Sequence, residues 1–150
     1  MAAYCRGVDR IDPELGRSVF HPDAVADYGD MFQGTGFEFI DFVCEAHRGF
    51  LTHTHQIGSI SIAVDGDTAA SECYVTARLR AENPGGGFVD ILSYGRYVDR
   101  WARRDDVWRI AHRRYLHEMD ETRTIEAGGF AVAGRRDRTD PSYEVLGATR

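Results

Sequence analysis

The change of hydrophobic period near residue 52 constrains the fold more than any other feature of the sequence. Residues 52–64 and 68–80 are rich in β-branched side chains that alternate with others, and the Asp-Gly-Asp segment at 65–67 predicts a hairpin turn between them. Residues 88–103 and 107–117 repeat the pattern around a second turn. The sequence therefore predicts a meander of four long antiparallel strands.

The first third of the chain carries helical signals instead. Residues 1–8 predict a short helix, and Asp12-Pro13 supplies an N-cap and a first-turn proline for a helix over 14–20. Apolar side chains recur at helical spacing over 37–50 and predict an amphipathic helix there. Helices that precede a meander are typical of an α+β chain. Such a sheet can curl over the helices and leave a closed pocket between them.

The segment between the helices carries weaker signals. His21-Pro22-Asp23 predicts a stop and a turn, and residues 24–28 alternate like a short strand. Gly34-Thr35-Gly36 predicts a second break before the long helix.

Charge and composition exclude several classes of partner. The chain has 18 basic and 24 acidic residues and a net charge of −6, which argues against a nucleic-acid or membrane-surface partner. No apolar run is long enough to span a membrane, and no signal-peptide pattern opens the chain, so we expect a cytoplasmic protein. Cys5, Cys44 and Cys73 show no paired spacing and are interpreted as reduced thiols.

The last part of the chain differs from the rest. It is rich in Gly, Arg and Asp from residue 126 onward and has little apolar periodicity. We expect a catalytic domain over residues 1–118 and a C-terminal arm over residues 119–150. That arm would fray, pack on a neighbouring subunit or cover the mouth of the pocket.

Five segments together resemble the SnoaL-like group of the nuclear-transport-factor-2-like superfamily, over about residues 1–118. They are YCRGVDR at 4–10, HPDA at 21–24, THTH at 52–55, VDGD at 64–67 and VWRI at 107–110. The resemblance implies a cone-shaped α+β fold, in which a curved antiparallel sheet packs on N-terminal helices. Similar members include scytalone dehydratase, bile-acid 7α-dehydratase and hexachlorocyclohexane dehydrochlorinase. These enzymes eliminate water or HCl without a metal or an organic cofactor.

The resemblance implies four catalytic positions. Asp9 matches the aspartate of the dehydrochlorinase, and His55 matches its catalytic histidine. Tyr4 and Tyr28 match tyrosines that line the pocket of the bile-acid dehydratase. A histidine with a pKa of about 6.5 suits a general base, and a carboxylate on its far nitrogen fixes the tautomer. From the residues alone, Asp9 would also serve as a helix cap or a surface carboxylate, although Asp12 is better placed as the cap.

Further residues are candidates for substrate binding. His53 shares a strand face with His55, and a metal site that adds His47 is the alternative; no third ligand has a strand-compatible position, so we predict no metal. Arg78 lies on a strand whose one face is polar, which is either solvent-exposed or the pocket wall. A guanidinium on that wall would bind a substrate oxygen anion. For this reason we do not infer a steroid substrate from the resemblance to the bile-acid dehydratase.

Two more candidates come from the later strands. Arg113 is a similar, weaker candidate for substrate binding, because residues 109–114 also fit a solvated charged face. Tyr97 is interpreted either as part of a substrate clamp or as core or interface packing.

The expected function is a cofactor-independent lyase acting on a small aromatic or polycyclic alcohol. Dehydration is the leading version, and a retro-aldol-type loss of a small aldehyde such as formaldehyde needs the same base. The alternatives are an isomerase or cyclase like ketosteroid isomerase and the polyketide cyclases, or a non-catalytic ligand-binding module. By analogy with resembled lyases, we expect a homotrimer, with a dimer second.

Overall fold

Three helices form at the start of the chain, where the sequence predicts them. The computed structural model describes residues 1–126, 128 and 131–147. The first helix, α1, spans Ala2–Asp9, and α2 spans Pro13–Ser18. Asp12 caps α2 by accepting a hydrogen bond from the backbone N of Leu15 at 3.1 Å. The predicted second helix is therefore confirmed, although it ends at Ser18 instead of residue 20.

The long helix α3 spans Gly36–Arg48 and begins at a capping box. The Thr35 side chain accepts from the backbone of Glu38, and the Glu38 carboxylate accepts from the backbone of Thr35. These two reciprocal bonds satisfy backbone donors that the first turn of a helix leaves free. The break predicted at residues 34–36 is thus the start of this helix.

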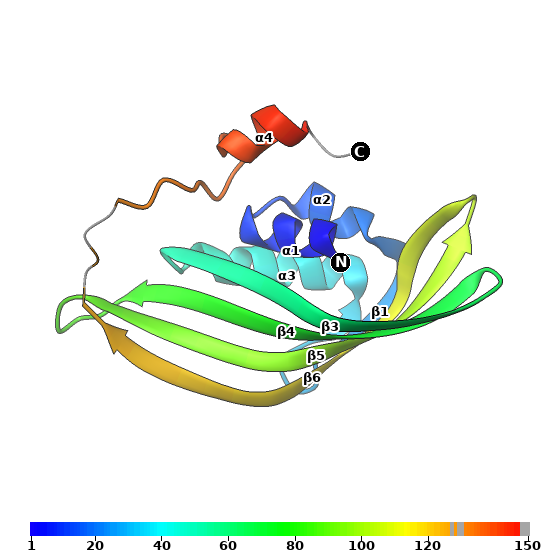
Figure 1. Ribbon diagram of the computed structural model, residues 1–150, viewed down its shortest axis with the longest axis horizontal. Helices are drawn as coiled ribbons and strands as arrows, with labels where there is room; N and C mark the ends of the chain where they lie inside the picture. Colours follow the sequence, from blue (N-terminus) through cyan, green and yellow to red (C-terminus); the bar gives the residue numbers. More distant parts are fainter. Residues whose placement is uncertain (127, 129–130, 148–150) are drawn as a thin grey trace.

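Six strands form one curved sheet in the order β2-β1-β6-β5-β4-β3. Every neighbouring pair is antiparallel except β1 and β6, which are parallel. The predicted α+β cone is confirmed (Figure 1). The strands are β1 (Phe20–Asp27), β2 (Gln33–Thr35), β3 (Thr52–Asp65), β4 (Thr68–Glu82), β5 (Phe88–Arg104) and β6 (Val107–Ile125).

The turn predicted at residues 21–23 was wrong, because this segment belongs to the first strand. His21, Pro22 and Asp23 lie inside β1. The pairing of β1 with β6 is irregular between Phe20 and Val25, and this irregularity accommodates a proline that has no N–H to donate. A Pro in a strand signals a bulge as readily as a stop, so the sequence alone did not separate the two.

A second irregularity shifts the register between β3 and β4. The hairpin turn pairs Asp65 with Thr68, and that register continues as far as Ser61. A bulge at residues 58–61, where Ser59 has a φ of 48°, then moves the pairing by one residue. His55 consequently lies opposite Ala77 and not opposite Arg78.

The helices cover the concave face of the sheet (Figure 1). The buried core joins α1 and α3 to the inner faces of β1, β4 and β5. Among its members, Val8, Phe20, Ile40 and Ile110 are at most 1% exposed. This layer fixes the end of α1 against the start of β3, where the candidate site lies.

The C-terminal arm returns over the outer side of α1 and α2 and ends in α4 (Pro141–Leu146) (Figure 1). The sheet itself continues past residue 118, because β6 ends at Ile125. The hydroxyl of Tyr143 donates to Asp12 at 2.7 Å, and Arg6 donates to Ser142 at 2.8 Å. The described part of the arm therefore packs on helices of its own chain. Residues 127, 129, 130 and 148–150 of the expected arm lie outside the described residues.

No helix within the described ranges is both long enough and apolar enough to span a membrane.

Candidate active site

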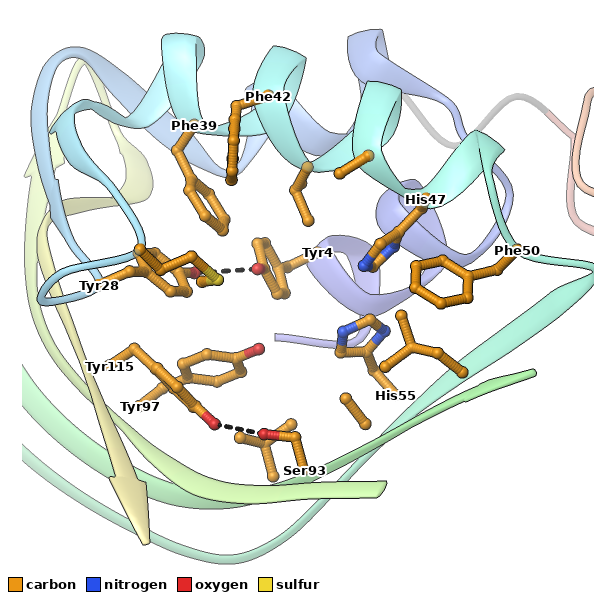
Figure 2. Close-up of a pocket in the computed structure, with 16 residues that line it drawn as sticks. Tyr4, Tyr28, Phe39, Phe42, His47, Phe50, His55, Ser93, Tyr97 and Tyr115 are labelled. Carbon is orange, nitrogen blue, oxygen red and sulfur yellow. Dashed lines mark hydrogen bonds between the residues drawn. The ribbon is translucent and has the colours of Figure 1, made fainter. Parts of the chain in front are cut away.

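A cavity of about 270 Å³ lies between the helices and the concave face of the sheet (Figure 2). Its wall is mostly aromatic and aliphatic, with hydroxyl and imidazole groups at a few points. The lining residues are Tyr4, Tyr28, Met31, Phe39, Phe42, Val43, Ala46, His47, Phe50, His55, Val75, Ala77, Leu79, Ser93, Tyr97 and Tyr115. An apolar cavity with a few convergent polar groups is typical of a small-molecule site.

Asp9 and His55 are held together by two hydrogen bonds. The Nδ1 of His55 lies 2.7 Å from one carboxylate oxygen of Asp9, and the backbone N of His55 donates to the other at 3.0 Å. Because a carboxylate accepts hydrogen bonds, Nδ1 carries the proton and Nε2 keeps its lone pair. His55 lines the cavity, whereas Asp9 lies behind it. The structure thus brings this predicted pair together in the order that a general base requires.

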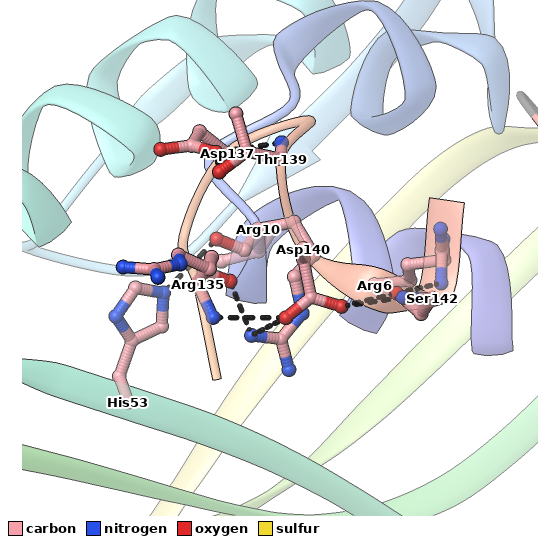
Figure 3. A network of polar contacts seen from close by, with 9 residues as sticks. Arg6, Arg10, His53, Arg135, Asp137, Thr139, Asp140 and Ser142 are labelled. Carbon is pink, nitrogen blue, oxygen red and sulfur yellow. Dashed lines mark hydrogen bonds and ion pairs between the residues drawn. The ribbon is translucent and has the colours of Figure 1, made fainter. Parts of the chain in front are cut away.

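His53 holds the same junction from the same face of β3, two residues before His55. It is 2% exposed, and its Nε2 donates to the backbone oxygen of Val8 at 3.0 Å. Figure 3 shows its ring pointing from β3 toward the arm. His53 does not line the cavity, so the expected substrate contact is replaced by a structural one: it ties the last turn of α1 to β3 beside Asp9.

The tyrosines form the second polar part of the cavity. The hydroxyls of Tyr4 and Tyr28 lie 2.9 Å apart, and the Tyr97 ring packs edge-on against Tyr4 at 5.5 Å. Burial raises the pKa of all three phenols well above the ordinary value. They therefore stay protonated and can donate hydrogen bonds. The structure places Tyr4 and Tyr28 at the cavity, as the resemblance implied, and it places Tyr97 both in the core and in the cavity wall.

Arg113 lies inside the protein and is absent from the cavity wall. Its side chain and that of Asp99 are both fully buried, and two hydrogen bonds of 2.8 Å join them. The guanidinium lies 4.3 Å from the ring centre of Tyr4 and 4.0 Å from that of Tyr97. Arg113 thus supports the tyrosines from behind by ion pairing and cation–π contact, and it does not line the cavity.

Arg78 faces away from the cavity. Val75, Ala77 and Leu79 line the cavity, so the alternation of β4 places Arg78 on the opposite face. There it pairs with Asp90, which also accepts from Arg80 at 2.8 Å. The proposed pocket-wall position of Arg78 was wrong. The bulge in β3 is the reason. Residues directly opposite each other share a face of the sheet, and without the bulge His55 would lie opposite Arg78 instead of Ala77.

Several cavity residues were not singled out as site residues from the sequence. Ser93 and Tyr115 are joined by a hydrogen bond of 2.9 Å between their hydroxyls, and the Phe39 ring of α3 stacks on the Tyr28 ring with centres 3.7 Å apart. Tyr115 lies directly over Gly95, where a Cβ would come within 2.4 Å of its ring. His47, named from the sequence only as a ligand of the alternative metal site, also lines the cavity. Its spacing from Val43 and Phe50 places it on the same helix face as these apolar residues, which is the signal that could have found it.

Three imidazoles gather beside the Asp9–His55 pair. The ring centres of His47 and His53 lie 4.4 Å apart, and those of His47 and His55 lie 5.6 Å apart. Two of their nitrogens are already committed, to Asp9 and to the Val8 carbonyl. Among the residues that the structure describes, no three His, Cys, Asp or Glu side chains are arranged to hold a metal ion.

Solved structures with the same fold include two proteins from Novosphingobium. A scytalone dehydratase-like protein of Novosphingobium aromaticivorans is 24% identical, with a TM-score of 0.68 over 86% of this chain and 88% of the other. The hexachlorocyclohexane dehydrochlorinase LinA-type3 of Novosphingobium barchaimii is 16% identical, with a TM-score of 0.71 over 86% and 89%. At these identities the likeness shows the fold alone.

Sequence comparison identifies the family of the chain but gives no function for it. An uncharacterised protein of Mycobacterium tuberculosis is 33% identical over an alignment of 101 positions, and this alignment covers 63% of this chain and 65% of that protein's length. A family model described as the SnoaL-like domain matches residues 1–114, which include Tyr4, Asp9 and His55. The resemblance noted in the sequence is confirmed, and the chain belongs to the SnoaL-like domain family.

Proposed function

We propose that the protein is a cofactor-independent lyase that acts on a small aromatic or polycyclic alcohol. One observation carries the proposal: His55, held by Asp9 through Nδ1, lines a cavity whose walls are largely aromatic. A buried Asp–His pair that opens on an apolar cavity favours an enzyme over a binding module. The shared fold with a scytalone dehydratase-like protein and a dehydrochlorinase supports elimination as the reaction class.

His55 acts as the general base in this proposal. Its Nε2 lone pair takes a proton from the carbon beside the leaving group, and the C–H electrons form a double bond as the C–O bond breaks. The departing hydroxide takes a proton from the Tyr4 or Tyr28 hydroxyl and leaves as water, and the proton that His55 removed then replaces the one that the phenol gave. Asp9 stabilises the imidazolium that forms and holds the ring in the required tautomer. General-base catalysis of this kind contributes roughly 10²–10⁴ in rate.

Tyr4 and Tyr28 assist the departing group or hold a substrate carbonyl. Only one hydroxyl hydrogen is needed for the bond between the two phenols, so the other is free to point at the substrate. A phenol kept protonated by burial is a neutral donor at the position where negative charge develops on oxygen.

Two related reactions start from the same base. In a retro-aldol-type cleavage, His55 would take the proton from a hydroxyl, and the C–C bond would break to release a small aldehyde such as formaldehyde. The carbon that keeps the electron pair would then take the proton back from His55. In an isomerisation, it would return the proton to another carbon of the same molecule. The products separate the three reactions, because only elimination releases water and only cleavage releases an aldehyde.

The test is a panel of aryl and naphthyl carbinols and β-hydroxy ketones, with new double bonds followed by absorbance and formaldehyde by a colorimetric assay. We expect turnover of at least one member by the wild type and a loss of about 10²–10⁴ in His55→Ala. Tyr115→Phe keeps the dyad and serves as the matched cavity control. Turnover by His55→Ala within a few-fold of wild type would rule out His55 as the base.

The expected homotrimer stays a proposal, as does the cytoplasmic location. Exposed apolar side chains at the far end of the sheet, Ile60, Ile62 and Val64, supply a surface for subunit contact. Light scattering of the purified chain is expected to give the mass of a trimer. A monomer at micromolar concentration would contradict this expectation.

A further inference from the structure

His47 places a second imidazole in the cavity, beside the proposed base. It lies in the last turn of α3, is 8% exposed and lines the cavity. Its ring centre is 5.6 Å from that of His55, and the two ring planes are 28° apart. Figure 2 shows the ring extending from α3 toward His55, while Tyr28, Tyr97 and Tyr115 lie at the other end of the cavity.

The ring of His47 lacks a partner of its own. Its Nδ1 is buried and makes no hydrogen bond to a described residue. His53 lies against it but commits its Nε2 to Val8, and the Nδ1 of His53 is equally unpaired. Buried polar atoms without partners are rare in native proteins, because each one loses its bonds to water without replacement. Such an atom in a cavity wall points to a missing ligand group.

His47 is a neutral hydrogen-bonding group and not an acid. Burial lowers its pKa to about 3, with further lowering from His53, His55 and Arg136. Arg136 of the arm also donates to the backbone oxygen of His47 at 2.8 Å and so fixes this turn. The neutral ring offers one N–H donor and one lone pair to whatever enters the cavity.

The neighbours of His47 leave few other partners for a polar ligand atom. Ala46, Phe50 and Leu79 also line the cavity, and all three are apolar. An oxygen placed at this end would have the two histidines as its hydrogen-bond partners. A site that hydrogen-bonds a substrate oxygen rejects an analogue without it more strongly than an apolar site can.

We propose that His47 is a substrate-binding residue that hydrogen-bonds an oxygen substituent next to the carbon at which His55 acts. The inference rests on the proposed function for the role of His55, and it deepens that function by naming the substrate class. The substrate is an aromatic compound with two oxygen groups: one that leaves or is polarised at the tyrosines, and one that His47 recognises.

Binding of two probes of similar shape, 1-naphthol and 1-methylnaphthalene, tests the proposal without any turnover. Titration calorimetry of the wild type is expected to show a preference for 1-naphthol. In His47→Leu this preference should fall at least about tenfold, while the affinity for 1-methylnaphthalene is kept. Met31→Leu changes an apolar lining residue to which no role is assigned, and this control should keep the preference.

The outcomes separate this inference from the proposed lyase activity. No preference in the wild type, or a preference that survives in His47→Leu, would overturn the role of His47 whatever the turnover assays show. A preference lost in Tyr28→Phe and kept in His47→Leu would assign the oxygen to the tyrosines. His47→Asn keeps a donor and an acceptor and should restore part of the preference, which covers the case in which the leucine variant does not fold.

Discussion

Asp9–His55 and Asp99–Arg113 are both buried pairs of a carboxylate and a base, and they differ in what they face. The side chains of Asp99 and Arg113 have no exposed surface and lie under the tyrosine rings. Those of Asp9 and His55 are 11% and 7% exposed, and His55 reaches the cavity. Similar partners thus serve two purposes. The sealed pair holds the scaffold under the tyrosines, and the open pair presents an unprotonated nitrogen to a ligand.

The ionic environment of the sealed pair is consistent with a structural role. Burial opposes the charge on Arg113, but Asp99 and the neighbouring tyrosines outweigh it and raise the pKa of the guanidinium. Its two parallel bonds to Asp99 give the planar geometry that arginine and carboxylate prefer. A charge that stays paired over the whole working pH range is suited to holding a structure and not to moving a proton.

The largest effect is expected from breaking the sealed pair. Asp99→Ala leaves the Arg113 charge buried without a partner and should lower the free energy of unfolding by about 3–5 kcal/mol. The double variant Asp99→Leu/Arg113→Met removes both charges and should recover most of that loss. Urea unfolding of the three proteins measures this. Equal stability of Asp99→Ala and wild type would contradict a structural role.

Asp9→Asn should change activity more than stability. The amide keeps the shape of the carboxylate but no longer favours the Nδ1–H tautomer, so turnover should fall about 10- to 100-fold while the free energy of unfolding changes by about 1 kcal/mol or less. Steady-state kinetics and urea unfolding on the same preparation give both numbers. A loss of stability as large as that of Asp99→Ala would place Asp9 in the scaffold and end the contrast between the two pairs.

The pH dependence of stability should report the buried, neutral state of His47. Folding lowers the pKa of His47 to about 3, so between about pH 6.5 and 3 the unfolded chain binds a proton that the folded chain does not. The neutral His47 therefore does not reduce stability above about pH 6.5. Below that pH, the free energy of unfolding falls by up to about 1.4 kcal/mol per pH unit because of this one group. His47→Leu should show a shallower slope in urea unfolding between pH 6.5 and 4.5. An unchanged slope would mean that His47 is already protonated in the folded protein.

Local patterns predicted most of the helices and strands, whereas the pairing of Asp9 with His55 came from another source. The period change at residue 52, the cap at Asp12 and the hairpin turns are features of adjacent residues, and the structure has them where the sequence indicates. Asp9 and His55 were paired through the family resemblance and not through spacing. The cone fold then brings the end of α1 against the start of β3, as that pairing requires.

The corrected residues depend on tertiary features that local patterns do not report. Arg78 changed faces because of one bulge, and a bulge shifts every side chain beyond it. Arg113 looked like part of a charged surface, because its partner Asp99 is on another strand. No substrate-binding role was predicted for His47, because its neighbours on the helix face are apolar. Its importance comes from the two histidines of β3 that pack beside it.

The tautomer of His55 tests the central claim most directly, because it needs no substrate. Nitrogen NMR of imidazole-labelled protein at neutral pH is expected to show a protonated Nδ1 and an unprotonated Nε2 on His55, with a shift toward the Nε2–H form in Asp9→Asn. A protonated Nε2 in the neutral wild-type ring, or a tautomer that Asp9→Asn leaves unchanged, would contradict the account.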